Sequence, residues 1–233
     1  MSRECMARDL LARVARDHHP AALASSLSAE DMVLTDLIGR GRLAIEIFVL
    51  DTGRLHGDTL DLVGRAEQRY GITYRVFRPQ PQAVNEYAVR FGRDAFYESV
   101  ELRKQCCGIR KVEPLRRALA DKQAWITGMR RGQSALRDDI ALGEYDQAHG
   151  LMKFNPLADW SEAEVWDHIG RYEVPYNPLY DQGYRSIGCA PCTRPVVAGE
   201  DARAGRWWWE AHAAPECGIH FSPDGKIIRE KAL

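Results

Sequence analysis

The order of apolar segments in the first eighty residues constrains the fold more than any other feature. Strand-like apolar runs are expected at 21–24, 42–53 and 72–79, and segments with helical spacing at 3–16, 29–39 and 60–70. A further strand is expected in "AWITGMRRGQS", ending at Thr127 and Gly128. Strands that alternate with helices are typical of an α/β protein with a parallel sheet.

The strand ends predict where a ligand binds, because ligands of parallel sheets sit beyond the carboxyl ends of the strands. The segments "SSLSAED" and "LDTGR", the loop after Pro79, and Thr127-Gly128 should therefore share one edge. The first segment offers serine hydroxyls and the amides of a helix N-terminus to a phosphate. An ordinary helix N-cap explains the same serines equally well.

Beyond these elements the pattern changes. Ser161 and Glu164 predict a capping box at a helix start, and Trp160 with Val165 a hydrophobic staple. The segment that follows is rich in proline and glycine, holds half of the six cysteines, and is expected to fold over the sheet edge. We divide the chain into an α/β part at 1–192 and a C-terminal tail at 193–233.

Composition excludes several classes of protein. The net charge of −1 argues against a nucleic-acid binder, although 101–137 carries ten Lys or Arg against three acids. No apolar stretch approaches the ~20 residues of a membrane span, and the N-terminus lacks the apolar region of a signal peptide. The cytoplasm is the expected location, where cysteines stay reduced.

Four cysteines form two pairs, Cys106-Cys107 and Cys189-Ala-Pro-Cys192. Together they supply four thiolates, enough for a [4Fe–4S] cluster or a tetrahedral zinc ion. Adjacent cysteines favour the larger cluster, because each thiolate can bind a different iron. Zinc, unrelated core thiols and, for the C-x-x-C pair alone, a dithiol redox motif are also compatible with the pattern.

Cys217 lies outside both pairs, in "PECGIH", and could simply be packed. Its glycine- and proline-rich setting and His220 nearby favour a nucleophilic thiolate that the chain delivers to a site elsewhere. If the other four thiols hold a metal, Cys217 has no resolving partner in the chain except Cys5. An external dithiol such as thioredoxin would then reset it.

Several cations are candidates for binding an acidic ligand. A solvated surface position is the favoured interpretation for any one of them, but as a set near the cysteines they point to a ligand. These cations are Lys111, Arg130, Arg131, Arg137, Arg203 and Arg206.

Seven segments, in order, resemble the assimilatory sulfonucleotide reductases, in the iron–sulfur form that acts on adenosine 5′-phosphosulfate (APS). They are "LDTGRL", "CCGIRKVEPL", "WITGMRRGQS", "KFNPLADWSEAEVW", "YNPLYDQGYRSIGCAPCT", "GRWWWE" and "ECGIH". The resemblance covers nearly the whole chain. It implies the parallel-sheet fold of adenine-nucleotide PP-loop proteins, with a flexible C-terminal segment that carries the catalytic cysteine.

The same resemblance implies the chemistry. Cys217 would attack the sulfur of APS, leaving an S-sulfocysteine and AMP, and thioredoxin would then release sulfite. Lys111 would lie between cluster and substrate, and His220 beside the phosphate and sulfate. The implied cluster ligands are Cys106, Cys107, Cys189 and Cys192. The implied substrate-binding residues are Ser25, Ser26, Thr52, Gly53, Thr127, Gly128, Arg137, Arg203 and Arg206.

Two segments depart from the family pattern. "ASSLSAED" lacks a glycine that many relatives carry, and "SALR" is one residue short, which affects Arg137. The 3′-phosphorylated nucleotide (PAPS) could replace APS as the substrate. A PP-loop enzyme that modifies tRNA or nucleotides, or a non-enzymatic metal-binding module, would account for part of the same pattern. The sequence leaves a homo-oligomer open.

Overall fold

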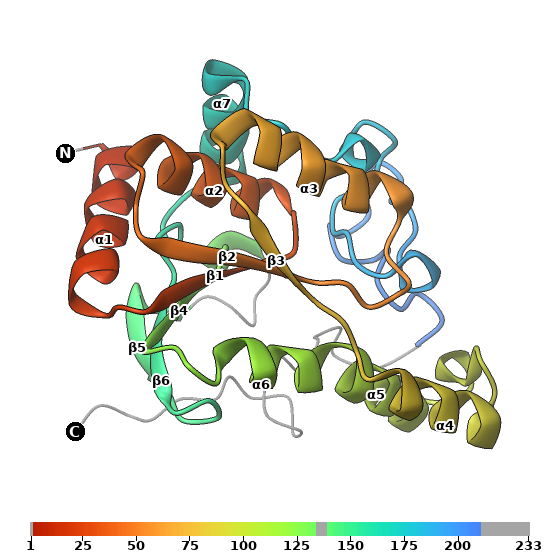
Figure 1. Ribbon diagram of the computed structural model, residues 1–233. Helices are drawn as coiled ribbons and strands as arrows, with labels where there is room; N and C mark the ends of the chain where they lie inside the picture. The colour runs from red at the N-terminus through yellow and green to blue at the C-terminus, as the bar shows by residue number, and fades with distance from the viewer. Residues whose placement is uncertain (1, 134–138, 211–233) are drawn as a thin grey trace.

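A six-stranded sheet runs through the centre of the protein (Figure 1). The computed structural model describes residues 2–133 and 139–210. The strand order is β3-β2-β1-β4-β6-β5, and every neighbouring pair is parallel except β5 with β6. The strands are β1 (Ala21–Ser25), β2 (Ile45–Leu50), β3 (Tyr74–Phe77), β4 (Ala124–Ile126), β5 (Gly143–Asp146) and β6 (Leu151–Phe154).

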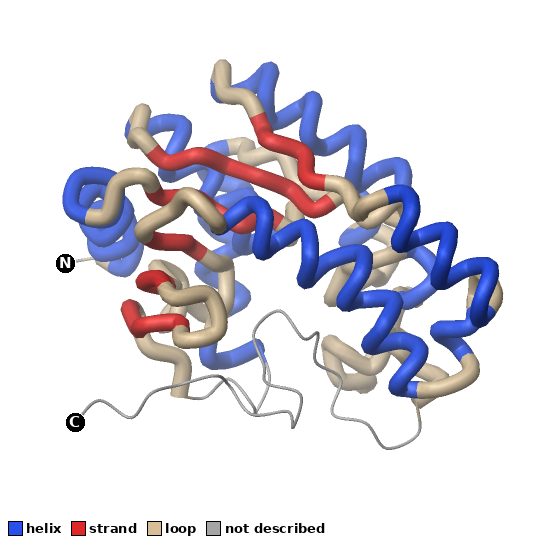
Figure 2. Tube along the Cα trace, turned by 60° about the horizontal axis from the view of Figure 1, so that its bottom comes forward, coloured by secondary structure: helices blue, strands red, loops and turns tan. Residues whose placement is uncertain are grey.

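Helices cover both faces of the sheet, as the two views show (Figures 1 and 2). One face packs against α1 (Arg3–Asp17), α2 (Ala29–Gly41), α3 (Gly57–Tyr70) and α7 (Glu162–Tyr172). The opposite side carries α4 (Pro81–Phe91), α5 (Val100–Cys107) and α6 (Glu113–Leu119). A π-helical turn, η2 (Gly108–Val112), joins α5 to α6. The short 3₁₀ turns are η1 (Ala95–Tyr97), η3 (Arg131–Gln133), η5 (Pro178–Tyr180) and η6 (Ala190–Cys192).

Alternation along β1 explains the two-sided core. Leu23 is fully buried in the cluster with α1, α2, α3 and α7, and Ala22 in the cluster with Leu115 of α6. Successive side chains of a strand point to opposite faces, so a strand buried on both sides is apolar throughout.

The predicted α/β class and the strands at β1 to β4 are confirmed. The capping box at Ser161 is also present, with Glu164 in reciprocal hydrogen bonds. The loop expected after Pro79 is instead the helix α4, which begins at Pro81. Among the described residues, no helix is long and apolar enough to cross a membrane.

Candidate active site

A cavity of about 290 Å³ opens at the carboxyl ends of β1, β2 and β4. The chain leaves β1 toward β2 on one side, whereas β4 lies on the other, so the cavity sits at the switch point of the sheet. Seven of the predicted substrate-binding residues line it. They are Ser25, Ser26, Thr52, Thr127, Gly128, Arg203 and Arg206.

Hydrogen-bond donors in the loop after β1 are paired with acceptors within the protein. The backbone N–H and the hydroxyl of Ser26 both donate to Asp31 Oδ2, at 2.7 and 2.6 Å. Ser28 caps α2, and the N–H of Ala29 donates to the Tyr180 hydroxyl at 3.0 Å. The N-cap interpretation is therefore correct for Ser28, and an internal carboxylate holds the donors of Ser26 that the sequence assigned to a phosphate.

Asp31 is almost fully buried at this loop. Burial raises the pKa of Asp31 to about 6, against the lowering effect of the hydrogen bonds from Ser26. Gly128 on the neighbouring β4 loop makes room for the carboxylate, because a Cβ there would lie 2.4 Å from Asp31 Oδ1. Any side chain at position 128 would therefore disturb the loop after β1.

Two of the six candidate cations are bound internally. Arg130 is buried, and its Nε donates to Glu30 Oε1 at 2.9 Å. Arg131 forms an ion pair with Asp159. The sequence grouped both arginines with the possible ligand-binding cations, but their charges are already balanced by carboxylates that are distant in the chain.

The loop after β2 connects the cavity with the cysteines. Thr52 is fully buried, and its hydroxyl lies 3.3 Å from the Cys189 sulfur. Its carbonyl accepts a 2.6 Å hydrogen bond from Arg110 of the π-helical turn. Gly53 adopts φ 69°, a conformation that favours glycine, and lies outside the cavity lining.

Three of the four paired cysteines influence one another electrostatically. Burial raises the pKa of the Cys106 thiol, and Cys189 raises it further, whereas Arg110 lowers it. Burial likewise raises the pKa of Cys192 to about 12, again assisted by Cys189 and opposed by Lys111 and Arg206. Cys107 follows Cys106 directly at the end of α5.

The two cysteine pairs are the residues predicted from the sequence to hold a metal centre. Among residues 2–133 and 139–210, no group of three or more His, Cys, Asp or Glu side chains is placed to hold one metal ion. A four-iron cluster, in which each iron takes a separate cysteine, stays a prediction from the sequence.

Cationic side chains lie between the cavity and the cysteines. Lys111 lines the cavity, and its positive charge lowers the pKa of the Cys192 thiol. Arg206 is buried, its Nε has no hydrogen-bond partner, and its Nη1 lies 3.4 Å from the Ser186 hydroxyl. A buried guanidinium with an unsatisfied donor calls for an anionic ligand at this end of the cavity.

Residues 206–210 pack onto both cysteine segments. The buried Arg103 of α5 binds the Glu210 carboxylate with Nε and, at 3.0 Å, with Nη2. Its guanidinium also lies 4.3 Å from the centre of the Trp207 ring. The N–H of Trp207 donates to the carbonyl of Cys192 at 3.3 Å. The start of the C-terminal segment is thus attached to the helix that ends in Cys107 and to the C-x-x-C turn.

Arg137, Cys217 and His220 fall outside the described residues, and their roles stay predictions. The division of the chain at residue 192 also stays a prediction.

Sequence reasoning missed Arg185, which lines the cavity. Its Nη1 lies 4.0 Å from Glu162 Oε1. Arg185 lies within "YNPLYDQGYRSIGCAPCT", and its place in that family-like segment was the only signal in the sequence.

The fold and the cavity define the class as an α/β nucleotide-binding protein, and solved structures agree. A phosphoadenylyl-sulfate (PAPS) reductase from Candida auris matches with a TM-score of 0.70 at 26% identity, over 81% of this chain and 90% of that one. An FMN adenylyltransferase of Candida glabrata shares the fold alone, with a TM-score of 0.57 at 13% identity, over 91% of this chain and 74% of that one.

The chain belongs to the family described as the phosphoadenosine phosphosulfate reductase domain, whose profile matches residues 20–195. A relative named adenosine 5′-phosphosulfate reductase, from Allochromatium vinosum, is 54% identical over 95% of this chain and 88% of its own length. One with the same name from Agrobacterium fabrum is 46% identical over 87% and 78%. The resemblance inferred from the seven sequence segments is therefore confirmed.

Proposed function

We propose that the protein is an oxidoreductase that reduces APS to sulfite and AMP in sulfate assimilation in the cytoplasm, with thioredoxin as the source of electrons. The curated relatives at 46–54% identity carry the name of this activity. The structural observation that carries the proposal is the position of Lys111. This lysine lines the cavity, and its charge lowers the pKa of the nearby Cys192 thiol. A cation that lines the cavity close to one of the paired thiols suits a substrate with adjacent phosphate and sulfate groups.

In the first step, the thiolate of Cys217 attacks the sulfur of APS. A bond forms between Sγ and that sulfur, the bond from sulfur to the bridging oxygen breaks, and AMP leaves with the electron pair. Lys111, Arg203 and Arg206 line the cavity and would neutralise the charge that develops on the leaving phosphate. His220, three residues after Cys217, would help to orient the thiolate.

In the second step, a thiolate of reduced thioredoxin attacks Sγ of the S-sulfocysteine. The sulfur–sulfur bond breaks, sulfite leaves with its electron pair, and a mixed disulfide forms. The second thiol of thioredoxin resolves that disulfide and returns Cys217 to the thiol form. The two electrons that reduce the sulfur thus come from one dithiol.

Cys106, Cys107, Cys189 and Cys192 would hold a [4Fe–4S] cluster. When bound, the cluster would organise the segments around the cavity and set the local charge beside Lys111. Cys106, Cys189 and Cys192 lie close enough to influence one another electrostatically, which supports this assignment.

The test is mass spectrometry after mixing anaerobic enzyme with APS and no thioredoxin. One SO₃ group should appear on Cys217 and should be absent from Cys217→Ser. Cys5→Ser is the matched control, because Cys5 is the other cysteine outside the two pairs, and it should keep the adduct. An adduct on any other residue would show that the nucleophile is misassigned.

PAPS is the second candidate substrate, because the matching family and the Candida auris protein carry its name. Steady-state rates on APS and PAPS separate the two. Higher kcat/KM on APS is expected, in line with the names of the curated relatives.

A further inference from the structure

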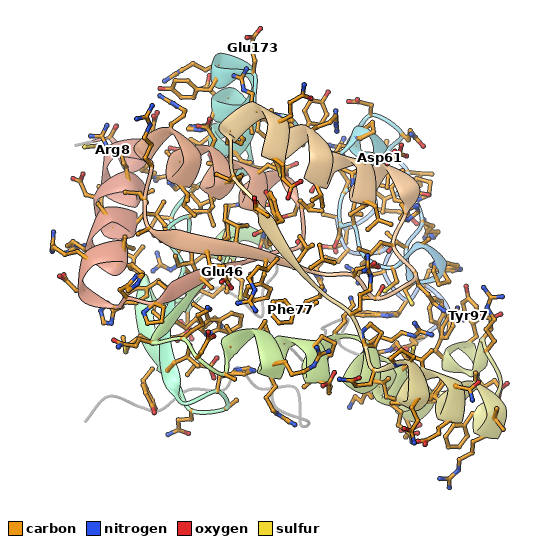
Figure 3. All side chains as sticks on the ribbon, viewed as in Figure 1. Arg8, Glu46, Asp61, Phe77, Tyr97 and Glu173 are labelled. Carbon is orange, nitrogen blue, oxygen red and sulfur yellow. The ribbon has the colours of Figure 1, made fainter. Side chains whose placement is uncertain are left out.

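Four aromatic rings form a continuous row at the start of the C-terminal segment. Phe96 contacts Tyr97, with ring centroids 4.5 Å apart, and Tyr97 contacts Trp209 edge-on at 4.5 Å. Trp209 then contacts Trp208 at 5.0 Å. We refer to Phe96, Tyr97, Trp208 and Trp209 as the aromatic row. Figure 3 places Tyr97 at the rim of the molecule, beside the segment that precedes residue 210.

The row is held rigidly by its neighbours. The Tyr97 hydroxyl donates to the carbonyl of Pro191 at 2.7 Å, within the Cys189–Cys192 turn. Glu210, directly after Trp209, is held by Arg103. Phe96 is buried and forms the base of the row. Rigid aromatic side chains lose little conformational entropy when they bind a partner.

Two rings of the row are exposed to a degree that core packing does not explain. Tyr97 is 42% exposed and Trp208 is 43% exposed, although both are large aromatic side chains. Tyr and Trp are the side chains that contribute most often to binding energy at protein interfaces. An exposed aromatic surface that is already ordered is therefore a candidate docking surface.

We propose that the aromatic row is the docking surface for the thioredoxin-class dithiol protein that regenerates Cys217. This inference rests on the proposed function, because it takes Cys217 as the residue that carries the sulfite group. The row adjoins Glu210, the last described residue, and Cys217 follows seven residues later. An extended chain spans at most about 3.4 Å per residue, so a linker of this length reaches roughly 24 Å at most.

The position of the row suits the second step. A protein seated on Trp208 and Tyr97 would contact the origin of the segment that carries Cys217 and the C-x-x-C turn at once. Docking would keep the partner's thiol within reach of Cys217, which raises the effective concentration of that thiol at the Cys217 sulfur. A small dithiol needs no such surface, because it can reach the S-sulfocysteine from any open direction.

The test measures sulfite release from enzyme that has been loaded with APS and freed of excess substrate. Thioredoxin and dithiothreitol serve as separate reductants for wild type, Trp208→Ala and Tyr97→Ala. The control is Tyr145→Ala, because Tyr145 is 48% exposed and lies on β5, at the far end of the sheet from the row (Figure 1). Mass spectrometry first confirms that each variant carries the adduct.

We expect kcat/KM for thioredoxin to fall about tenfold or more in Trp208→Ala and Tyr97→Ala, as for interface hot spots. Release by dithiothreitol and the Tyr145→Ala rates should match wild type. Equal losses with both reductants, or no loss with thioredoxin, would overturn the proposal. So would a wild-type dimer that Trp208→Ala dissociates in analytical ultracentrifugation, because the row would then bind a second copy. Absence of the adduct in wild type would instead refute the proposed function.

Discussion

The buried carboxylate of Asp31 should make the stability of the protein depend on pH between 5 and 7. Asp31 carries a pKa of about 6 in the folded protein, against an ordinary value of 3.8. Between these values the folded state holds a proton that the unfolded state has lost. Stability therefore decreases as pH rises through this window, which is opposite to the behaviour of a carboxylate in a favourable ion pair.

The magnitude follows from linkage. A shift of about 2 pKa units corresponds to about 3 kcal/mol of destabilisation once both states are ionised. About 1 kcal/mol of this destabilisation develops between pH 5 and pH 7. The substitution Asp31→Asn keeps the shape of the side chain and an oxygen that can accept from Ser26, but it removes the titrating proton.

The assay is urea denaturation of wild type and Asp31→Asn at several pH values from 5 to 7. The difference between their unfolding free energies should change by about 1 kcal/mol across this range, with the variant gaining relative stability as pH rises. Asp61→Asn removes an exposed carboxylate of α3 and is the control, with no comparable change expected. Parallel curves for wild type and Asp31→Asn would refute the reasoning.

Three further predictions follow from contacts described above. In urea titrations, Arg103→Met should lower the unfolding free energy by about 3 kcal/mol or more, because Glu210 is left buried without its partner. The double variant Arg103→Met with Glu210→Met should recover most of the lost free energy. If the double variant stayed as unstable as Arg103→Met, the contact of Arg103 with Trp207, not the ion pair, would be the main source of its stabilisation. Lys111→Ala should slow formation of the Cys217 adduct by about tenfold or more without lowering the iron content; loss of iron would contradict an electrostatic role. Gly128→Ala should weaken AMP binding in calorimetry, because the new Cβ would press on the loop after β1, and unchanged affinity would show that this loop can yield.

The sequence predicted the sheet well where segments were apolar on both faces. β1 and β2 are nearly continuous apolar runs, because parallel strands are covered by helices on both sides. β5, "GEYD", has no such signal, because it is a short edge strand that leaves much of its surface exposed. Its position depends on pairing with β6, which local sequence does not report.

The candidate site was likewise predictable only in part. Side-chain chemistry and spacing identified the cysteine pairs and the strand-end loops. Charge alone did not distinguish Arg130, which binds Glu30 one hundred residues away, from Arg206, whose Nε stays unsatisfied. The partners of buried arginines are selected by the tertiary fold, so a count of cations in a sequence overestimates those available to a ligand.

The contact between Thr52 and Cys189 has a consequence for biosynthesis. It joins residues 137 positions apart, so it cannot form until most of the chain has left the ribosome and the sheet has assembled. Cys106 and Cys107 leave the ribosome long before Cys189 and Cys192, so under the proposed cluster assignment they must stay reduced until those residues emerge. Loading of the proposed cluster would then be a late event, and a nascent chain that stalls before residue 189 would expose two unpartnered cysteines to cellular oxidants.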